Sequence, residues 1–314
     1  MVYTEFLTTV QHMLEQRLGK GYTLSLLTVP KNNGILLDGL SILPPESGLA
    51  PTVYLNAFYQ QYLDGMSLET IVDEIQKLFE DNPPPACIQP DRISDFSQAA
   101  PKIMMKLVQT MSNRELLSDV PHIPFMDLSV VFYLALGRND YGQMTALVHK
   151  EHLELWNTDQ NTLLRLAAVN TPAACPALIQ SMGQVLRELA RNNPCASHDE
   201  AALDRLIEKS RNITPLYVLT NTTGIYGACC LLYPKVIKDF ADSLASDLVI
   251  IPSSIHEVLL TPVEKEISYS SLNAMVASIN QSEVPPEDRL SDHIYLYRRR
   301  YETFCMILPD GRIV

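Results

Sequence analysis

The sequence predicts an α+β protein in which antiparallel β-hairpins pack with several helices, arranged in two lobes. Segments with apolar residues three and four positions apart alternate irregularly with short β-rich runs. Several of these runs are separated by short turns containing Asn or Gly, which is typical of hairpins. A proline-rich stretch at 82–90 reads as an extended linker. It predicts an N-terminal lobe over 1–90 and a C-terminal lobe over 91–314.

The predicted N-terminal lobe combines one hairpin with three helices. Phe6, Val10 and Leu14 recur at helical spacing, and an Asn-Asn-Gly turn at 32–34 joins two β-rich runs. Ser67 is well placed to cap the last helix, because its side-chain oxygen can accept a free backbone N–H. The predicted elements are a helix over 3–18, strands over 22–29 and 35–43, and helices over 52–64 and 67–80.

The predicted C-terminal lobe repeats one order of elements: strand, turn, strand, helix. The run 128–136 is the most strand-like of the chain, and its uninterrupted apolar character predicts burial on both faces. The order recurs from 216 to 244, which indicates either two related hairpin–helix units or the ordinary sequence of elements in α+β proteins. The elements are helices over 98–111, 151–156, 158–169, 199–210, 234–244 and 264–280, and strands over 128–136, 144–148, 216–221, 228–232, 293–297 and 301–308.

Composition excludes several classes of protein. The 314 residues are 46% hydrophobic and 19% charged, which is ordinary for a globular chain. The formal net charge is −12, and an acidic surface of this kind repels phosphate backbones. The run Arg298-Arg299-Arg300 lies in a predicted strand, where successive side chains alternate between faces and cannot meet one backbone. We therefore expect no binding to nucleic acid.

The cysteines and the apolar runs bear on location. The six cysteines form no Cys-x-x-Cys motif and have no regular spacing, as expected for reduced thiols. The first residues carry Glu5 and lack the apolar stretch of a signal peptide. No run approaches the length needed to span a bilayer. The expectation is a cytoplasmic protein that does not associate with membranes.

The strongest candidates for chemistry are His256 and Glu257, which follow a Pro-Ser-Ser turn. They do not form the zinc motif His-Glu-x-x-His, because position 260 is Leu260. They could act as acid and base at the entrance of a strand, near Asn221 at the end of another. The alternative is structural: the serines cap backbone groups, and His256 bonds a neighbouring carbonyl.

Two further histidines, His149 and His152, stand three residues apart and would be adjacent on a helix. A third ligand such as Glu151, Asp127 or His122 would complete a metal site, but the sequence does not show that these converge. The alternative is a solvated helix start, and we predict no metal. No Gly-x-Gly-x-x-Gly, phosphate-binding loop or Gly-x-Ser-x-Gly motif is present, so we predict no cofactor.

Four phrases of the chain resemble a bacterial family catalogued as domain of unknown function 5688. They are Pro51-Thr-Val-Tyr-Leu55, Gly65-Met-Ser-Leu-Glu-Thr-Ile-Val-Asp-Glu-Ile75, Val120-Pro-His-Ile-Pro-Phe-Met-Asp-Leu128 and Ile251-Pro-Ser-Ser-Ile-His-Glu-Val258. The resemblance covers nearly the whole chain. It implies a bacterial cytosolic protein and brings no activity, cofactor or catalytic residue with it.

These observations lead to two hypotheses of function. The first is a non-catalytic binding module with a protein or peptide partner, which requires an exposed apolar patch or an unpaired sheet edge. The second is a hydrolase-like enzyme that uses His256 and Glu257 near Asn221, which requires these groups at the wall of a pocket.

Overall fold

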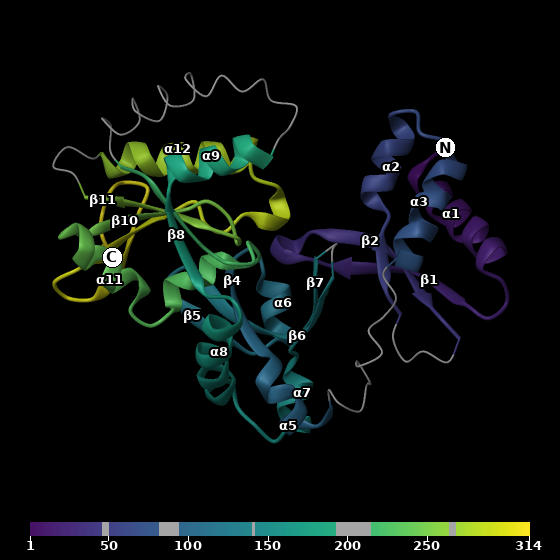
Figure 1. The fold of residues 1–314 in the computed structure, drawn as a ribbon, viewed down its shortest axis with the longest axis horizontal. Helices are drawn as coiled ribbons and strands as arrows, with labels where there is room; N and C mark the ends of the chain where they lie inside the picture. Colours follow the sequence, from purple (N-terminus) through teal and green to yellow (C-terminus); the bar gives the residue numbers. More distant parts are fainter. Residues whose placement is uncertain (46–49, 82–93, 140–141, 193–214, 264–267) are drawn as a thin grey trace.

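The computed structural model describes residues 1–45, 50–81, 94–139, 142–192, 215–263 and 268–314. These residues form an α+β protein with three antiparallel sheets of three, four and six strands (Figure 1). The predicted fold class is therefore confirmed. The predicted boundary between residues 90 and 91 lies outside the described residues, as does the helix predicted over 199–210. The division into two lobes stays a prediction.

The N-terminal sheet follows the predicted hairpin closely. β1 and β2 are antiparallel, with Leu24 opposite Ile42, and the Asn-Asn-Gly turn joins them. The helix predicted over 52–64 is wrong at its start, because 52–54 form an edge strand paired to β2. The elements are α1 (Tyr3–Leu18), β1 (Thr23–Pro30), β2 (Leu36–Leu43), β3 (Thr52–Tyr54), α2 (Asn56–Leu63) and α3 (Leu68–Asp81).

This first sheet and its helices have a core of their own. Its buried residues come from α1, β1, β2, β3, α3 and the residue before α2, and the last of them is Phe79. Phe6, Val10 and Leu14 are completely buried, as the helical spacing predicts. Ser67 caps α3 by accepting the N–H of Thr70 at 3.2 Å, also as predicted.

A four-stranded sheet follows, in the order β4, β6, β5, with β7 on the other edge of β6. The helix predicted over 98–111 is wrong: only a short turn of helix precedes a strand at 103–109. That strand is buried on both faces, so its apolar residues run on without a period that distinguishes strand from helix. The strands are β4 (Ile103–Gln109), β5 (His122–Phe125), β6 (Leu128–Asn139) and β7 (Gly142–Leu147).

The six-stranded sheet has the order β13, β12, β10, β11, β9, β8 and is antiparallel throughout. The strand predicted over 228–232 is wrong: it is the 3-10 helix η3 (Gly227–Leu232), so the hairpin–helix plan does not recur. Instead β9 pairs with β8 and β11. The strands are β8 (Ala177–Ser181), β9 (Tyr217–Asn221), β10 (Leu248–Pro252), β11 (Val258–Pro262), β12 (Ile294–Arg298) and β13 (Thr303–Ile307).

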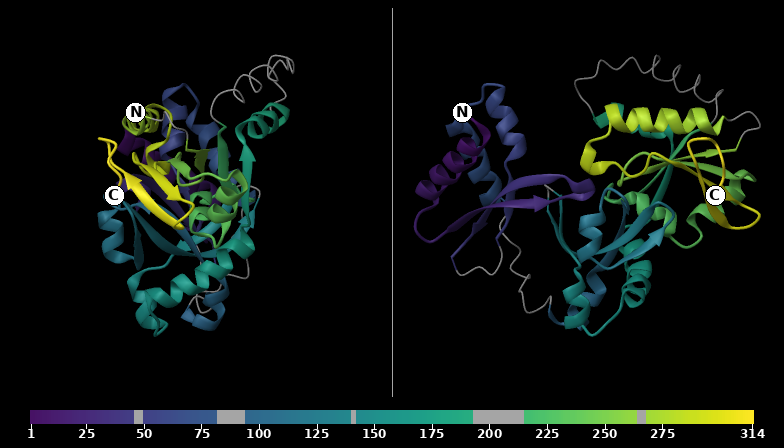
Figure 2. Two further views of the ribbon diagram at one scale, coloured as in Figure 1. Left: turned by 90° about the vertical axis from the view of Figure 1, so that its left-hand side faces the viewer. Right: turned by 180° about the vertical axis from the view of Figure 1, so that it is seen from behind.

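The four- and six-stranded sheets share one core, which includes Leu107 and Phe132 of the first and Leu260 and Tyr295 of the second. On its other face the six-stranded sheet carries α9 and α12 (Figures 1 and 2). None of the helices in the described part of the chain combines the length and apolar character needed to cross a membrane. The remaining helices are α5 (Phe96–Ala99), α6 (Arg114–Asp119), α7 (Lys150–Leu155), α8 (Gln160–Ala174), α9 (Met182–Asn192), α11 (Val236–Leu244) and α12 (Tyr269–Ser282).

The tip of the first hairpin contacts the rest of the protein through amide groups. The side chain of Asn33 donates to the carbonyls of Pro286 and Arg289 at 2.8 and 2.7 Å. Its backbone N–H donates to the side chain of Asn113 at 2.8 Å, and the Asn113 amide donates back to the Asn33 side chain at 2.9 Å. The hairpin turn thus lies against α6 and the 3-10 helix η4 (Pro286–Asp288).

Candidate functional site

His256 lies in the loop between β10 and β11, where both ring nitrogens have partners. The backbone N–H of Tyr226 donates to Nδ1 at 3.2 Å, and Nε2 lies 3.2 Å from a carboxylate oxygen of Asp288. Because Nδ1 accepts, the neutral ring carries its proton on Nε2 and donates it to Asp288. The ring also stacks on Tyr226, with an interplanar angle of 9°. His256 therefore holds three separate segments together.

Asn221 and Glu257, the other two predicted site residues, also make local contacts. The Asn221 side chain donates to the carbonyl of Ile225 at 2.8 Å and accepts from the N–H and hydroxyl of Thr223 at 2.9 and 2.7 Å. These bonds use its amide to shape the turn after β9. The carboxylate of Glu257 accepts a long hydrogen bond of 3.5 Å from the hydroxyl of Ser253.

Gly227 brings the loops of Asn221 and His256 together. A Cβ at this position would lie 2.3 Å from the Thr220 hydroxyl, 2.4 Å from the carbonyl oxygen of His256 and 2.8 Å from the backbone nitrogen of Asn221. Only a residue without a side chain allows this approach. The structure thus brings two of the predicted residues into one packed unit; a catalytic role for His256, Glu257 and Asn221 stays a prediction.

A lysine amine lies beside the ring of Tyr226, the residue that stacks on His256. The ammonium of Lys106, on β4, lies 4.5 Å from the centroid of the Tyr226 ring. The pKa of Lys106 is lowered from 10.5 to about 8, mainly by burial and to a smaller extent by repulsion from the charge of Lys31. Tyr226 has a left-handed backbone, with φ of 55°, and burial raises the pKa of its hydroxyl. This contact is not indicated by any sequence pattern, because Lys106 and Tyr226 are distant in the chain.

His149 and His152 lie at the start of α7, as the helix-start interpretation expects. The backbone N–H of His149 donates to Nδ1 of His152 at 2.9 Å, and Nδ1 of His149 lies 2.6 Å from a carboxylate oxygen of Asp119. The His152 ring stacks on Trp156, and burial lowers its pKa. Within the described residues, no group of three or more His, Cys, Asp or Glu side chains is placed to hold a metal ion.

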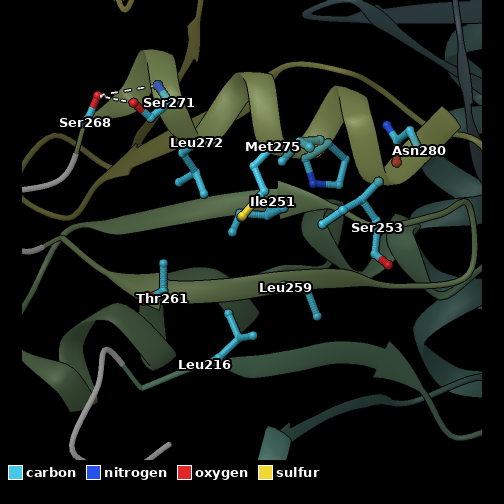
Figure 3. Close-up of a pocket in the computed structure, with 13 residues that line it drawn as sticks. Leu216, Ile251, Ser253, Leu259, Thr261, Ser268, Ser271, Leu272, Met275 and Asn280 are labelled. Carbon is cyan, nitrogen blue, oxygen red and sulfur yellow. Dashed lines mark hydrogen bonds between the residues drawn. The ribbon is translucent and has the colours of Figure 1, made fainter. Parts of the chain in front are cut away.

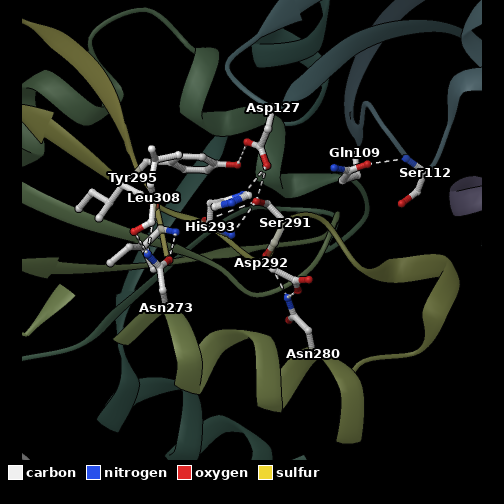
Figure 4. Close-up of polar contacts among 12 residues, drawn as sticks. Gln109, Ser112, Asp127, Asn273, Asn280, Ser291, Asp292, His293, Tyr295 and Leu308 are labelled. Atoms are coloured by element: carbon white, nitrogen blue, oxygen red, sulfur yellow. Dashed lines mark hydrogen bonds and ion pairs between the residues drawn. The ribbon is translucent and has the colours of Figure 1, made fainter. Parts of the chain in front are cut away.

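A third histidine–aspartate pair, His293 with Asp127, was not predicted from the sequence. One carboxylate oxygen of Asp127 accepts from the Ser291 hydroxyl at 2.7 Å and lies 3.2 Å from Nδ1 of His293; the other accepts from the Tyr295 hydroxyl at 2.7 Å (Figure 4). No described residue bonds Nε2 of His293. Ser291 and His293 precede β12, and Tyr295 lies within it. Their spacing of two residues could have indicated a shared face.

A groove of about 580 Å³ lies on the six-stranded sheet, between α12 and the strands β10 and β11 (Figure 3). Its walls are mainly apolar. Met275 and Leu272 reach from the helix toward the sheet, where Ile251 and Leu259 form the floor. Met275 and Ile279, which both line the groove, remain 49% and 45% exposed, so this apolar wall is open to solvent.

One polar atom in the floor of this groove has no partner. The hydroxyl of Thr261 is buried and makes no hydrogen bond to any described residue, and Thr261 as a whole is 5% exposed. It lies two residues beyond Leu259 on β11, so both side chains face the groove. A buried hydroxyl without a partner costs free energy, and a ligand that supplied one would recover it.

Comparison with known proteins places the chain by family alone. No match was found among the curated proteins or among the solved structures. The sequence model of one family, described as a family of unknown function (DUF5688), matches residues 3–299, which is nearly the whole chain. The chain therefore belongs to the family of unknown function DUF5688.

Proposed function

We propose that the protein is a non-catalytic binding module that holds an apolar segment of a protein or peptide partner in the groove between α12 and β10–β11. The observation that carries the proposal is an apolar groove whose floor contains one buried hydroxyl without a partner, that of Thr261. Apolar side chains of the partner would fill the groove, and one N–H or C=O would meet this hydroxyl.

A polypeptide suits the groove better than a compact small molecule. Met275 and Ile279, one helical turn apart on α12, line the groove and remain half exposed, and an extended segment lying along the helix would cover both. α12 contains no charged residue in its 14 positions, so neither sign of charge is repelled there. The net charge of −12 favours a partner with basic residues beside its apolar segment, because long-range attraction speeds association.

The test is selection from a displayed library of peptides of about 12 residues, followed by affinity measurement by calorimetry. We expect selected peptides to be apolar with basic flanks and to lose binding to Met275→Glu, which places a charge in the groove. Thr261→Val should weaken binding about tenfold, the equivalent of one hydrogen bond. Leu63→Glu, on exposed α2, is the matched control and should leave binding unchanged.

Two results would contradict this proposal. Peptides that bind Met275→Glu and the wild type equally well use another surface. Binding that is unchanged in Thr261→Val would show that the hydroxyl takes no part, which removes the observation that carries the proposal.

The second candidate function is a hydrolase-like enzyme that uses His256 and Glu257 near Asn221. It is supported by the contact between His256 and Asp288, since enzymes commonly orient an imidazole with a carboxylate. The comparison of His256→Ala and His293→Ala in a screen of activated esters tests it. Activity lost only in His256→Ala, with unchanged thermal stability, would support it; a drop in melting temperature without any activity to lose would favour the structural interpretation.

A further inference from the structure

Lys106 is an amine in an unusual place. It lies in the middle of β4, opposite Val131 on β6, and is flanked on the same face by Met104 and Val108. These neighbours belong to the two small apolar clusters on the face of the four-stranded sheet that is turned away from the shared core. The Lys106 side chain is partly buried among them, where a charged ammonium is poorly solvated.

No carboxylate compensates the charge of Lys106. In the described part of the chain, the ammonium group of Lys106 forms neither a hydrogen bond nor an ion pair. It contacts the face of the Tyr226 ring instead. Asp288, whose negative charge acts on the Tyr226 hydroxyl, is bonded to His256, the residue that stacks on the Tyr226 ring. The charged group that acts on Lys106 is another amine, Lys31 of the hairpin tip, and it repels.

The other titratable groups around Lys106 do not supply a negative charge either. Tyr133 packs against Tyr226 edge to face, and burial raises the pKa of both hydroxyls, so both remain neutral. Lys31 lies 3.9 Å above the ring of Tyr54. The tip of the first hairpin contacts β4, and there the charge of Lys31 acts on Lys106 while each of the two amines lies over an aromatic ring.

The consequence is a population of neutral amine at ordinary pH. With its pKa near 8, Lys106 is about one quarter neutral at pH 7.5, whereas an exposed lysine is about 0.1% neutral. Neutral amines are nucleophiles, and enzymes lower the pKa of imine-forming lysines by the same two means, burial and a neighbouring cation.

We propose that Lys106 is an imine-forming site for a small anionic aldehyde, with Lys31 binding the anionic group. The neutral amine attacks the carbonyl carbon, forming a C–N bond while the C=O π electrons move to oxygen. Both hydrogens of the amine leave with that oxygen as water, and a C=N bond remains. The step needs no reagent besides the aldehyde, and the anionic group would pair with the Lys31 charge that repels Lys106.

The experiment treats the full-length protein at pH 7.5 with glyoxylate or acetaldehyde, in separate samples containing cyanoborohydride to trap the imine. Peptide mass spectrometry then gives the rate at each lysine. We expect Lys106 to be alkylated at least tenfold faster than Lys77, an exposed lysine of α3 in the same sample. Lys31→Met should lower the preference for glyoxylate over acetaldehyde at Lys106 and leave it unchanged at Lys77.

Three controls make the outcome decisive. In denaturant Lys106 and Lys77 should react at equal rates, because the advantage depends on the fold. Lys106→Arg should remove the fast modification while circular dichroism remains unchanged. Alkylation of Lys106 no faster than that of Lys77 in the native protein would overturn the site, and a glyoxylate preference unaffected by Lys31→Met would overturn the role of Lys31.

Discussion

The loop between β10 and β11 and the groove over the same two strands make opposite use of polar groups. In the loop, both nitrogens of His256 have partners, and so do both ends of the amide of Asn221, at the end of the neighbouring strand β9. In the groove, the walls are apolar and the hydroxyl of Thr261 has none. Satisfied buried groups hold a scaffold in one shape, whereas an unsatisfied one in an open apolar groove leaves free energy for a ligand to gain. Whether the buried polar groups have hydrogen-bond partners thus distinguishes the scaffold from the candidate binding surface.

The largest effect expected from this comparison is that of Gly227→Ala, at the start of η3, where the chain packs against this loop. A new methyl would meet two backbone atoms at less than 3 Å, and neither can rotate away. We expect a loss of about 3 kcal/mol in the free energy of unfolding, measured by urea denaturation. Gly224→Ala is the matched control. Gly224 lies three residues earlier, but it has open space and a φ of 70°, so the loss should be near 1 kcal/mol. Equal losses would show that the close approach is not real.

His256→Ala should have the next largest effect. It leaves the backbone N–H of Tyr226 and the carboxylate of Asp288 without the ring that bonds both. We expect a loss of about 2 kcal/mol, measured in the same denaturation experiment. His12→Ala, whose side chain is 69% exposed, should change stability by less than about 0.5 kcal/mol. A neutral His256→Ala variant would remove the structural interpretation and strengthen the enzymatic one.

The parts of the fold that could be predicted are those with a clear period. α1, α3 and the first hairpin carry one buried face each, and the sequence shows it. The errors fall where a segment is buried on all sides: β4 resembled a helix, and η3 resembled a strand, because an unbroken apolar run fits either structure.

The site shows a different limit. His256 could be singled out from its own sequence neighbourhood, but its partner Asp288 lies 32 residues further on. Asp127 and His293 are 166 residues apart, and no local pattern reports a contact of that kind. Whether the Thr261 hydroxyl has a hydrogen-bond partner depends on which groups lie near it in the fold. A single sequence does not encode that arrangement. Hydrophobic periodicity predicts which face of a helix or strand is buried, but it does not predict which two elements pack against each other.

Lys106 offers a comparison within the scaffold, since it is a polar group without an ionic partner. Its pKa is lower in the folded chain, about 8, than in the unfolded chain, about 10.5. Between these values the unfolded state binds more protons, so the stability of the wild type should rise with pH through this window. Lys106→Met should therefore be more stable than the wild type by about 2 kcal/mol below pH 8, and lose this advantage as pH approaches 10.5. A constant difference from pH 7 to 10 would contradict the shift.

The smallest effect, and the sharpest test of the comparison, is expected at Thr261. Thr261→Val replaces a buried hydroxyl without a partner by a methyl of similar size, so the free protein should gain about 1 kcal/mol. Thr171→Val makes the same change at a hydroxyl that accepts the N–H of Met105 at 3.1 Å, and it should lose about 1 kcal/mol or more. The two variants exchange identical atoms at buried positions, so opposite signs can arise only from the presence or absence of a partner. If Thr261→Val is destabilised as much as Thr171→Val, the hydroxyl already has a partner in solution, and the groove has lost the polar feature that distinguishes it from ordinary apolar surface.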